Sequence, residues 1–166
     1  MHNITDPRRF RTLMSRFVTG VTVIAVPHSE VSDEVVAMTA SSVTSVSLSP
    51  LLLLFCIRNE SRLLPHLEAS GTFSVNVLAS HQDTISRYYG GQATPGCEGT
   101  WEFCDDAAPA LVGANASFIC RTQHLQAFGD HHVVIGEVVD MVSADPPAPA
   151  LIYAAGKYMG VELCHA

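Results

Sequence analysis

Short segments of β-branched and other apolar residues recur along the whole of this 166-residue chain, separated by turn-forming residues. Some seven of these segments have the pattern of a strand, and only two or three short stretches have the spacing of a helix. The helical stretches do not alternate regularly with the strands, which disfavours a parallel, doubly wound sheet. The pattern predicts a mainly β protein, an antiparallel barrel or sandwich with added helices. We expect a single domain over residues 1–166, with its core at about 10–158.

Several boundaries can be predicted from turn residues and from changes in hydrophobic pattern. The expected strands are 21–26, 35–40, 51–57, 72–78, 115–123, 132–142 and 151–154, and the expected helices are 8–17, 61–69 and 80–89. Residues 41–49 alternate small hydroxyl residues with Val and Leu, so they are expected to pair as a further strand. Segment 51–57 is apolar throughout, which predicts a central strand covered on both faces. Residues 124–131 are expected to connect the two strands on either side of them.

Charge and hydropathy exclude two kinds of partner. The chain has 9 Lys and Arg against 16 Asp and Glu, a formal charge of −7, and no basic run that could follow a nucleic-acid backbone. The longest apolar run, 51–57, is far shorter than the roughly 20 residues of a membrane-spanning helix. The first residues lack the layout of a secretory signal. We expect no nucleic acid and no membrane as partner, and a cytoplasmic protein.

The proportion of apolar residues favours self-association. Apolar residues make up 48% of the chain and charged residues only 15%, more apolar surface than a monomer of this size needs to bury. The five cysteines are odd in number and contain no C-x-x-C spacing. We therefore interpret them as free thiols and expect no metal site.

The common catalytic motifs are missing from the sequence. No G-x-G-x-x-G follows a strand, and no G-x-x-x-x-G-K-[ST] is present, so neither usual glycine cradle for a nucleotide exists. G-x-S-x-G and H-E-x-x-H are also absent, which disfavours a serine hydrolase and a zinc protease. Any chemistry must therefore come from a different set of residues.

The row of hydroxyl residues from Thr39 to Ser47 is the strongest positive feature, with Ser61 at a helix start one strand later. Hydroxyls and backbone N–H groups can bind a phosphate or the polar edge of a planar heterocycle, above all beside a helix N-terminus. A Ser/Thr-rich edge strand is the alternative, and composition alone favours it. Arg58 lies between the apolar strand and Ser61, where it could pair with a phosphate or form an ordinary surface ion pair.

The tripeptide Gly129-Asp130-His131 lies where two expected strands meet. Glycine permits a tight turn, and a histidine just after it would project at the rim of a barrel as a donor, stacking surface or proton carrier. A solvated turn histidine is the alternative. His131 and His132 are neighbours on a strand and point to opposite faces, so they do not form a joint metal site. Tyr158 could close a cleft or pack in the core.

Four segments together resemble the flavin reductase domain family. They are 17–23, 38–48, 76–78 and 129–131, in the family's order, and the resemblance extends over about 10–158. That family consists of small NAD(P)H:flavin oxidoreductases with an antiparallel Greek-key split barrel of the FMN-binding type. Many members are reductase components of two-component monooxygenases.

The resemblance implies a homodimer with flavin, FAD or FMN, bound near the subunit interface, and NADH or NADPH as co-substrate. His131 matches the family histidine near the nicotinamide and is the expected catalytic residue. Gly129 and Asp130 directly before it are expected to contribute to cofactor binding. The isoalloxazine edge is expected against Met38, Thr39, Ala40, Ser41 and Ser42, the ribityl-phosphate side against Ser45, Val46 and Ser47, and the phosphate against Cys56, Ile57, Arg58 and Ser61. Tyr158 is expected to contribute to cofactor binding.

The implied reaction is hydride transfer from a reduced nicotinamide to FMN or FAD, and the reduced flavin then diffuses to a partner monooxygenase. Such a reaction needs geometry rather than a nucleophile, which agrees with the missing motifs. Two alternatives stay open at this point: a flavin-binding carrier or sensor without turnover, and a flavoenzyme that acts directly on a small metabolite.

Overall fold

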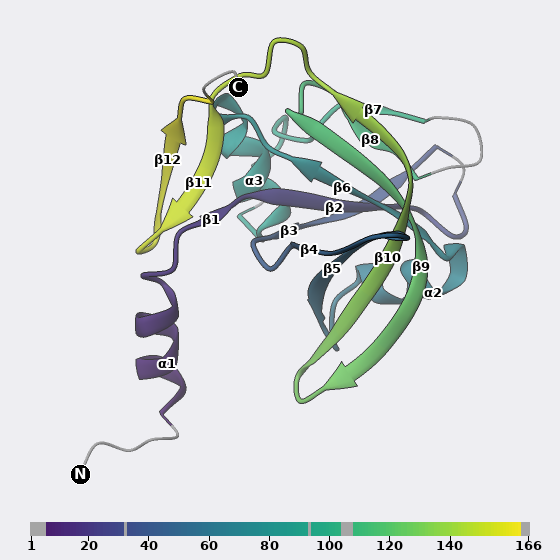
Figure 1. Cartoon of the computed structure of the whole chain (residues 1–166), viewed down its shortest axis with the longest axis horizontal. Coiled ribbons are helices and arrows are strands. Elements are labelled where there is room, and N and C mark those ends of the chain that lie inside the picture. Colours follow the sequence, from purple (N-terminus) through teal and green to yellow (C-terminus); the bar gives the residue numbers. More distant parts are fainter. Residues whose placement is uncertain (1–5, 32, 93, 104–107, 164–166) are drawn as a thin grey trace.

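The computed structural model describes residues 6–31, 33–92, 94–103 and 108–163. A sheet of seven strands, all paired in antiparallel fashion, curves around the core (Figure 1), as the strand-rich sequence predicts. In spatial order its strands are β3 (Val35–Ala40), β2 (Thr22–Pro27), β6 (Thr72–Val77), β9 (Ala116–Phe128), β10 (His131–Ser143), β5 (Leu51–Arg58) and β4 (Thr44–Leu48). Although β3 and β4 follow each other in sequence, they form the two opposite edges of this sheet.

Smaller elements surround the large sheet. A three-stranded sheet contains β1 (Thr19–Gly20), β11 (Ala150–Ala154) and β12 (Lys157–Val161), and a two-stranded one contains β7 (Trp101–Glu102) and β8 (Ala110–Leu111). The helices are α1 (Pro7–Met14), α2 (Leu63–Ser70) and α3 (Asp83–Tyr89), the last preceded by the 3₁₀ turn η1 (Ser80–Gln82). Helix α1 projects away from the body of the molecule (Figure 1). None of the described helices is long and apolar enough to cross a membrane.

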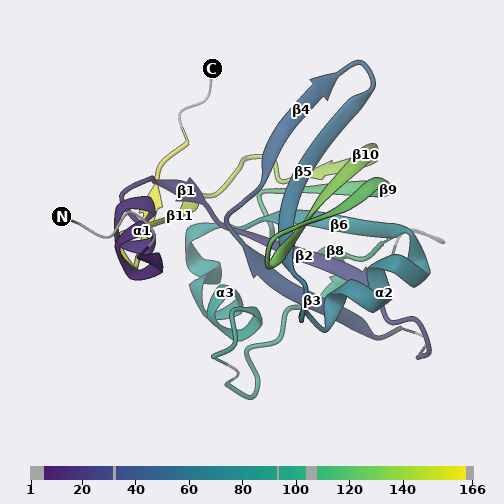
Figure 2. The same ribbon diagram turned by 90° about the horizontal axis from the view of Figure 1, so that it is seen from below.

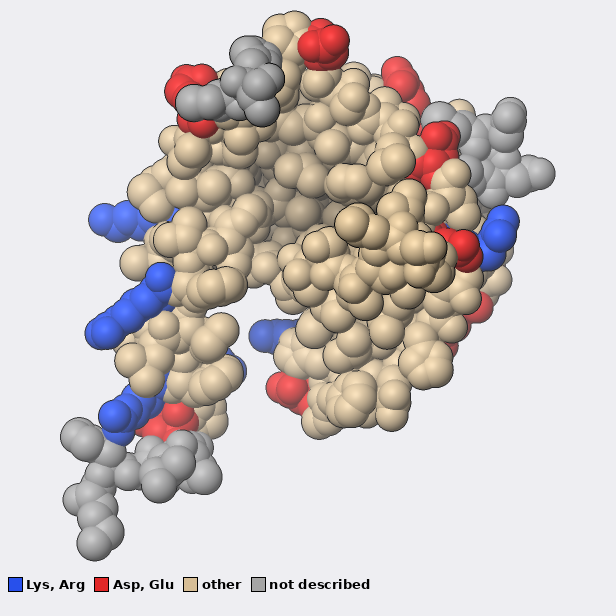
Figure 3. All heavy atoms as spheres, viewed as in Figure 1, with Lys and Arg blue, Asp and Glu red and all other residues tan. Residues whose placement is uncertain are grey.

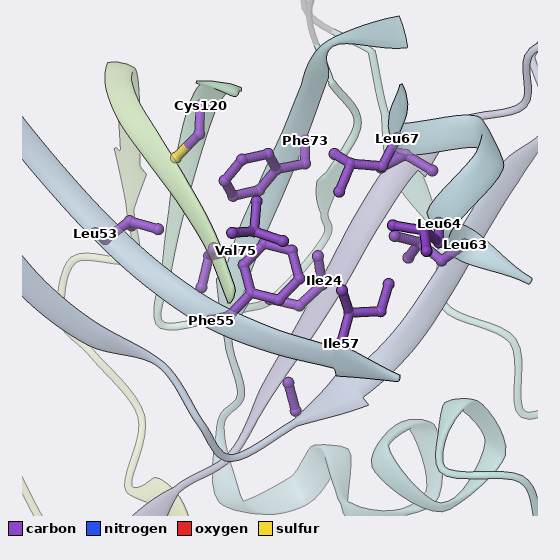
Figure 4. Close-up of a cluster of buried hydrophobic side chains, with 13 residues drawn as sticks. Ile24, Leu53, Phe55, Ile57, Leu63, Leu64, Leu67, Phe73, Val75 and Cys120 are labelled. Carbon is purple, nitrogen blue, oxygen red and sulfur yellow. The ribbon is translucent and has the colours of Figure 1, made fainter. Parts of the chain in front are cut away.

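The main core lies between the concave face of the sheet and α2 (Figure 4). The rings of Phe55 and Phe73 meet edge to face with centroids 5.1 Å apart, and both are fully buried. Leu63 and Leu67 of α2 are also fully buried against this cluster, and each such side chain contributes about 1.5–3 kcal/mol by leaving water. Gly71 ends α2 in the left-handed conformation, with φ of 66°.

Strand β5 differs from its prediction. In the single chain, its side chains alternate between the buried Leu53, Phe55 and Ile57 and their less buried neighbours. Leu51 retains 39% of its exposure. The prediction of a central strand covered on both faces is wrong, because β5 lies next to the sheet edge and only one face contacts the core.

Three segments of the chain also differ from their predicted structure. Residues 124–128 continue β9, so the hairpin to β10 turns only at Gly129-Asp130, where Gly129 has φ of 63°. The cross-strand pairing of Phe128 with His131 extends the ladder up to the turn. Residues 41–43 lie in no strand, because β3 ends at Ala40 and β4 begins on the other edge of the sheet. Strand β12 was not predicted; it forms by pairing with β11 across a tight turn.

Candidate functional site

A cavity of about 710 Å³ opens at the end of β3, beside β5, the first residue of β10 and the C-terminal end of α3. Its volume lies within the roughly 300–1,000 Å³ that small-molecule sites occupy. Nine residues predicted from the sequence line it: Met38, Thr39, Ala40, Ser41, Ser42, Cys56, Arg58, Ser61 and His131. These residues come from three separate parts of the chain. The pairing of β10 with β5 places His131 beside Arg58, and a hydrogen bond between Cys56 and Ser42 joins the end of β3 to β5.

The other predicted site residues lie elsewhere. Ser45, Val46 and Ser47 belong to β4, whose ribbon with β5 extends away from the body (Figure 2), and they do not line the cavity. Ile57 is fully buried in the core. Gly129 and Asp130 form the turn directly before His131, and Tyr158 lines a smaller neighbouring pocket. The roles of all these residues in binding stay predictions.

Two hydroxyls of the predicted row hold the walls of the cavity. The Ser42 Oγ atom accepts a hydrogen bond from the backbone N of Cys56 at 3.0 Å, which ties the segment after β3 to β5. The Thr39 hydroxyl donates to the carbonyl of Ser86 at 2.6 Å and so ties β3 to α3. Both side chains therefore position backbone, and their small size keeps the space between them open. Ser41 between them also lines the cavity and is exposed.

One end of the cavity contains groups that suit an anion. Arg58 ends β5, and Ser61 precedes α2, where its Oγ accepts a hydrogen bond from the backbone N of Leu63 at 3.3 Å. A guanidinium with a hydroxyl at a helix start can bind a phosphate. The carboxylate of Glu60 lines the same end, so an anion there must sit nearer to Arg58 than to Glu60.

His131 lies at the start of β10, opposite Arg58 in the ladder. Its Nδ1 atom is 2.7 Å from the Oδ1 atom of Asp130. The hydrogen bond and the charge of His131, with a smaller effect of Arg58, hold the pKa of the exposed Asp130 carboxyl below its usual value. The carboxylate therefore favours a proton on Nδ1, which leaves Nε2 as the ring nitrogen available for other contacts.

Four residues of the cavity were missed by the sequence reasoning: Glu60, Tyr89, Gly90 and Gly91. The sequence pattern placed Tyr89 at the end of the expected helix 80–89 and assigned no role in a binding site to the two glycines that follow. A Cβ atom on Gly90 would lie 2.9 Å from the carbonyl oxygen of Ser86, so only glycine fits where α3 ends against the cavity. The glycine is required by the helix's own Ser86 carbonyl, so the glycine pair in the sequence signals a tight helix end and not the cavity.

A second pocket of about 180 Å³ adjoins the first and shares Thr39, Ser41 and Gly90 with it. Its remaining walls are Val21 and the rings of Tyr153 and Tyr158. The Tyr158 hydroxyl is 2.9 Å from Ser86 Oγ, so the β11–β12 hairpin is fixed to α3 beside the larger cavity.

The comparisons with known proteins decide the family. The model of the flavin reductase like domain matches residues 14–162, nearly the whole chain. This chain belongs to the flavin reductase like domain family. The resemblance noted in the sequence is thereby confirmed.

Members of the family cover this chain almost completely. The reductase subunit HsaB of a flavin-dependent monooxygenase from Mycobacterium tuberculosis is 37% identical over 160 residues, 95% of this chain and 83% of its own length. Among solved structures, the flavin reductase PheA2 has a TM-score of 0.86 at 32% identity and covers 96% of this chain and all of its own. The NADH:FAD oxidoreductase SgcE6 of Streptomyces globisporus, in complex with NAD and FAD fragments, has a TM-score of 0.83 at 30% identity and covers 96% of this chain and 94% of its own. The prediction of the flavin reductase split barrel is confirmed by these matches.

The larger cavity fits a flavin. Ala40, Ser41 and Gly90 have small or no side chains, so backbone could approach a flat ring there, and Arg58 with Ser61 would hold its phosphate. Among the residues that the structure describes, no cluster of three or more His, Cys, Asp or Glu side chains could hold a metal ion.

Proposed function

We propose that this protein is an NAD(P)H-dependent flavin reductase that transfers a hydride from a reduced nicotinamide to FMN or FAD. The observation that carries the proposal is the cavity at the end of β3, in a chain that belongs to the flavin reductase family along nearly its full length. The chemistry belongs to the two cofactors, since the hydride passes from nicotinamide C4 to flavin N5. The protein contributes by holding the nicotinamide and the flavin in position for this transfer.

The residues of the cavity have separate tasks in this proposal. The segment from Met38 to Ser42 lies along the edge of the flavin ring, where backbone N–H groups stabilise the negative charge that reduction places on the ring. Arg58 and Ser61 bind the phosphate. His131 orients the nicotinamide through Nε2. Holding the two rings about 3–3.5 Å apart replaces a chance encounter by a positioned one.

Several residues that the sequence predicts to bind the flavin lie outside the cavity of the single chain. A second copy of the chain would bring such residues into a shared site. The β4–β5 ribbon carries exposed apolar side chains, with Leu48 86% and Val46 47% exposed, and Met141 of β10 is 57% exposed. Such a concentration of exposed apolar surface marks an interface. We propose that two copies associate through the β4–β5 ribbon and β10. The hydroxyls of Ser45 and Ser47 then lie within an interface beside the flavin phosphate.

Helix α1 has the same requirement for a partner. It has no buried residue, and Phe10, Leu13 and Met14 are each at least half exposed. An isolated helix of eight residues is marginal in water, so its apolar face needs a surface to pack on. Lys and Arg side chains lie on the side of the molecule that α1 occupies (Figure 3). Light scattering on the purified protein is expected to give twice the chain mass of 17.8 kDa.

We also propose that the reduced flavin serves a separate monooxygenase. The relative HsaB is named as the reductase subunit of a flavin-dependent monooxygenase, which supports this proposal. No residue pattern in this chain identifies the oxygenase, and transfer by diffusion of the reduced flavin needs no permanent complex. A cytoplasmic location stays a prediction.

Steady-state oxidation of NADH and NADPH, followed at the nicotinamide absorbance band with added FMN or FAD, tests the function. The proposal predicts saturable turnover that depends on free flavin. Tight flavin binding without turnover would favour a carrier or sensor. Turnover that depends on an organic metabolite and not on free flavin would favour a flavoenzyme acting directly on that metabolite.

A further inference from the structure

One side chain of the larger cavity has a charge that does not suit a phosphate. Glu60 lines the cavity beside Arg58 and Ser61, the two residues that bind the phosphate in the proposed function. A carboxylate repels a phosphate in proportion to the negative charge that the phosphate carries. Glu60 therefore weakens the binding of a highly charged phosphate more than that of a singly charged one.

The turn that contains Glu60 is fixed beside the cavity. The backbone N of Ser61 donates to the carbonyl of Arg58 at 3.0 Å, which closes a tight turn over residues 58–61. The backbone N of Asn59 donates to the carbonyl of Asp130 at 3.1 Å, and the Asn59 side-chain amide donates to the carbonyl one residue earlier, also at 3.1 Å. These bonds hold the backbone of Glu60 at the end of the cavity where the phosphate is expected.

The charges at this end nearly cancel. Among the described residues that line the cavity, Arg58 is the only one with a permanent positive charge. His131 is paired with Asp130, whereas neither Arg58 nor Glu60 takes part in an ion pair of the described residues. Arg58 also contributes to the lowered pKa of the Asp130 carboxyl, so its charge acts on that group too. One guanidinium is therefore opposed by two carboxylates, which leaves little net positive charge for a phosphate.

FMN and FAD differ in charge at the phosphate that follows the ribityl chain. In FMN this group is a phosphomonoester with a charge of about −1.5 to −2 at pH 7. In FAD a second nucleotide is joined to the same phosphate, which leaves it a single negative charge. The repulsion from Glu60 is accordingly greater for FMN than for FAD.

We propose that Glu60 is a specificity-determining residue that selects the flavin by the charge of this phosphate and shifts the preference of the site from FMN toward FAD. Arg58 and Glu60 are both exposed, so solvent screens their charges and the expected shift is moderate. The inference rests on the proposed function, since it needs the flavin in the larger cavity with its phosphate at Arg58.

The Kd values of FMN, FAD and riboflavin for the full-length protein, measured by flavin fluorescence at low salt, test the proposal. Glu60→Gln removes the charge and keeps the size of the side chain. It is expected to lower the Kd for FMN about tenfold and that for FAD about threefold, and to leave that for riboflavin, which has no phosphate, unchanged. The ratio of the Kd for FMN to that for FAD thus falls about threefold, and about 0.5 M NaCl is expected to remove most of this change.

Glu68→Gln is the matched control, because it removes the same charge from an exposed position of α2, and Glu68 does not line the cavity. It is expected to leave the ratio at its wild-type value. An unchanged ratio in Glu60→Gln, the same change in Glu68→Gln, or an equal gain in the binding of riboflavin would overturn the role of Glu60. A Glu60→Gln protein that does not fold is replaced by Glu60→Ser, with the same expectation.

Failure of the proposed function is distinguishable from failure of this inference. Wild-type protein that binds the flavins and oxidises neither NADH nor NADPH would refute the reductase activity. The Kd ratio in Glu60→Gln would still decide whether Glu60 selects the flavin, because it is measured without turnover.

Discussion

The Nδ1 atom of His131 lies 2.7 Å from the Oδ1 atom of Asp130, and the two residues link the β9–β10 turn to the larger cavity. Asp130 is itself outside the cavity and 89% exposed at its side chain, whereas the His131 ring is 38% exposed and lines the wall. The turn thus supplies a charged residue that orients the ring from behind.

The pKa of Asp130 provides a direct test of that contact. The His131 contact lowers the pKa of the carboxyl in the folded protein, so the carboxylate is favoured. The contact therefore stabilises the fold above the ordinary pKa of aspartate, and this contribution is lost as the pH falls through the lowered value. NMR titration of the Asp130 carboxyl is expected to show a higher pKa in His131→Ala than in the wild type. An equal pKa in both proteins would mean that the contact is absent in solution.

His131 itself is predicted to act on the nicotinamide. His131→Ala is expected to raise the KM for NADH up to about tenfold, the value of one hydrogen bond, while the Kd for FMN stays within about twofold. Steady-state kinetics and quenching of flavin fluorescence measure the two quantities. Equal loss of both, or loss of neither, would contradict the assigned role.

Arg58 is predicted to recognise the flavin phosphate. Arg58→Gln is expected to weaken FMN binding about tenfold and to leave the binding of riboflavin, which has no phosphate, nearly unchanged. Arg62→Gln is the matched control, since it removes the same charge four residues away, and Arg62 does not line the cavity. The assignment is wrong if Arg62→Gln and Arg58→Gln weaken FMN binding equally.

Asn76 is predicted to be structural, although it belongs to a segment that carries the family resemblance. It is fully buried; its amide nitrogen donates to the carbonyl of Val23 and to Ser74 Oγ, and its oxygen accepts from the backbone N of Leu111 and from Ser117 Oγ. Asn76→Ala is expected to lower the free energy of unfolding by about 3 kcal/mol, because these buried groups lose their partner.

Ser117→Ala removes only one of the four bonds of Asn76, so its expected cost is about 1 kcal/mol. Urea denaturation of the two variants and the wild type measures the difference. Similar free energies for Asn76→Ala and the wild type would show that the network contributes nothing.

Two cysteines provide a footprint of the cavity. Cys56 lines the cavity, whereas Cys120 is fully buried and burial raises the pKa of its thiol to about 12. Iodoacetamide at pH 8 is expected to modify Cys56 and not Cys120 in the folded protein, since Cys120 stays a protonated thiol at that pH. FMN at ten times its Kd is expected to slow the modification of Cys56 about tenfold. Peptide mapping by mass spectrometry gives both rates, and an unchanged rate at Cys56 would place the flavin elsewhere.

The sequence pattern could predict the strands but not their partners. Val35–Ala40 has the same bounds in the pattern and in the structure, because alternation and β-branching act locally. The row of hydroxyl residues from Thr39 to Ser47 has no local signal at the point where strand β3 ends and the chain leaves the sheet. The break depends on the bond between Ser42 and the backbone of Cys56, which lie 14 positions apart in the chain.

The difference between local pattern and long-range pairing also explains which residues of the site the sequence could predict. His131 meets Arg58 because β10 pairs with β5, and the segment after β3 meets β5 through the bond between Ser42 and Cys56. Tyr89 and Gly90 carry no sequence motif for a ligand, and they reach the cavity only through the packing of α3 on β3. The hydroxyls of Ser45 and Ser47 lie outside it, on an apolar ribbon whose partner is a second chain in our proposal.

A crystal structure of the protein with FMN tests the central claim most directly. The account predicts the flavin ring against the segment from Ala40 to Ser42, opposite Gly90, with the phosphate at Arg58 and Ser61. Flavin bound at any other surface, with this cavity empty, would contradict it.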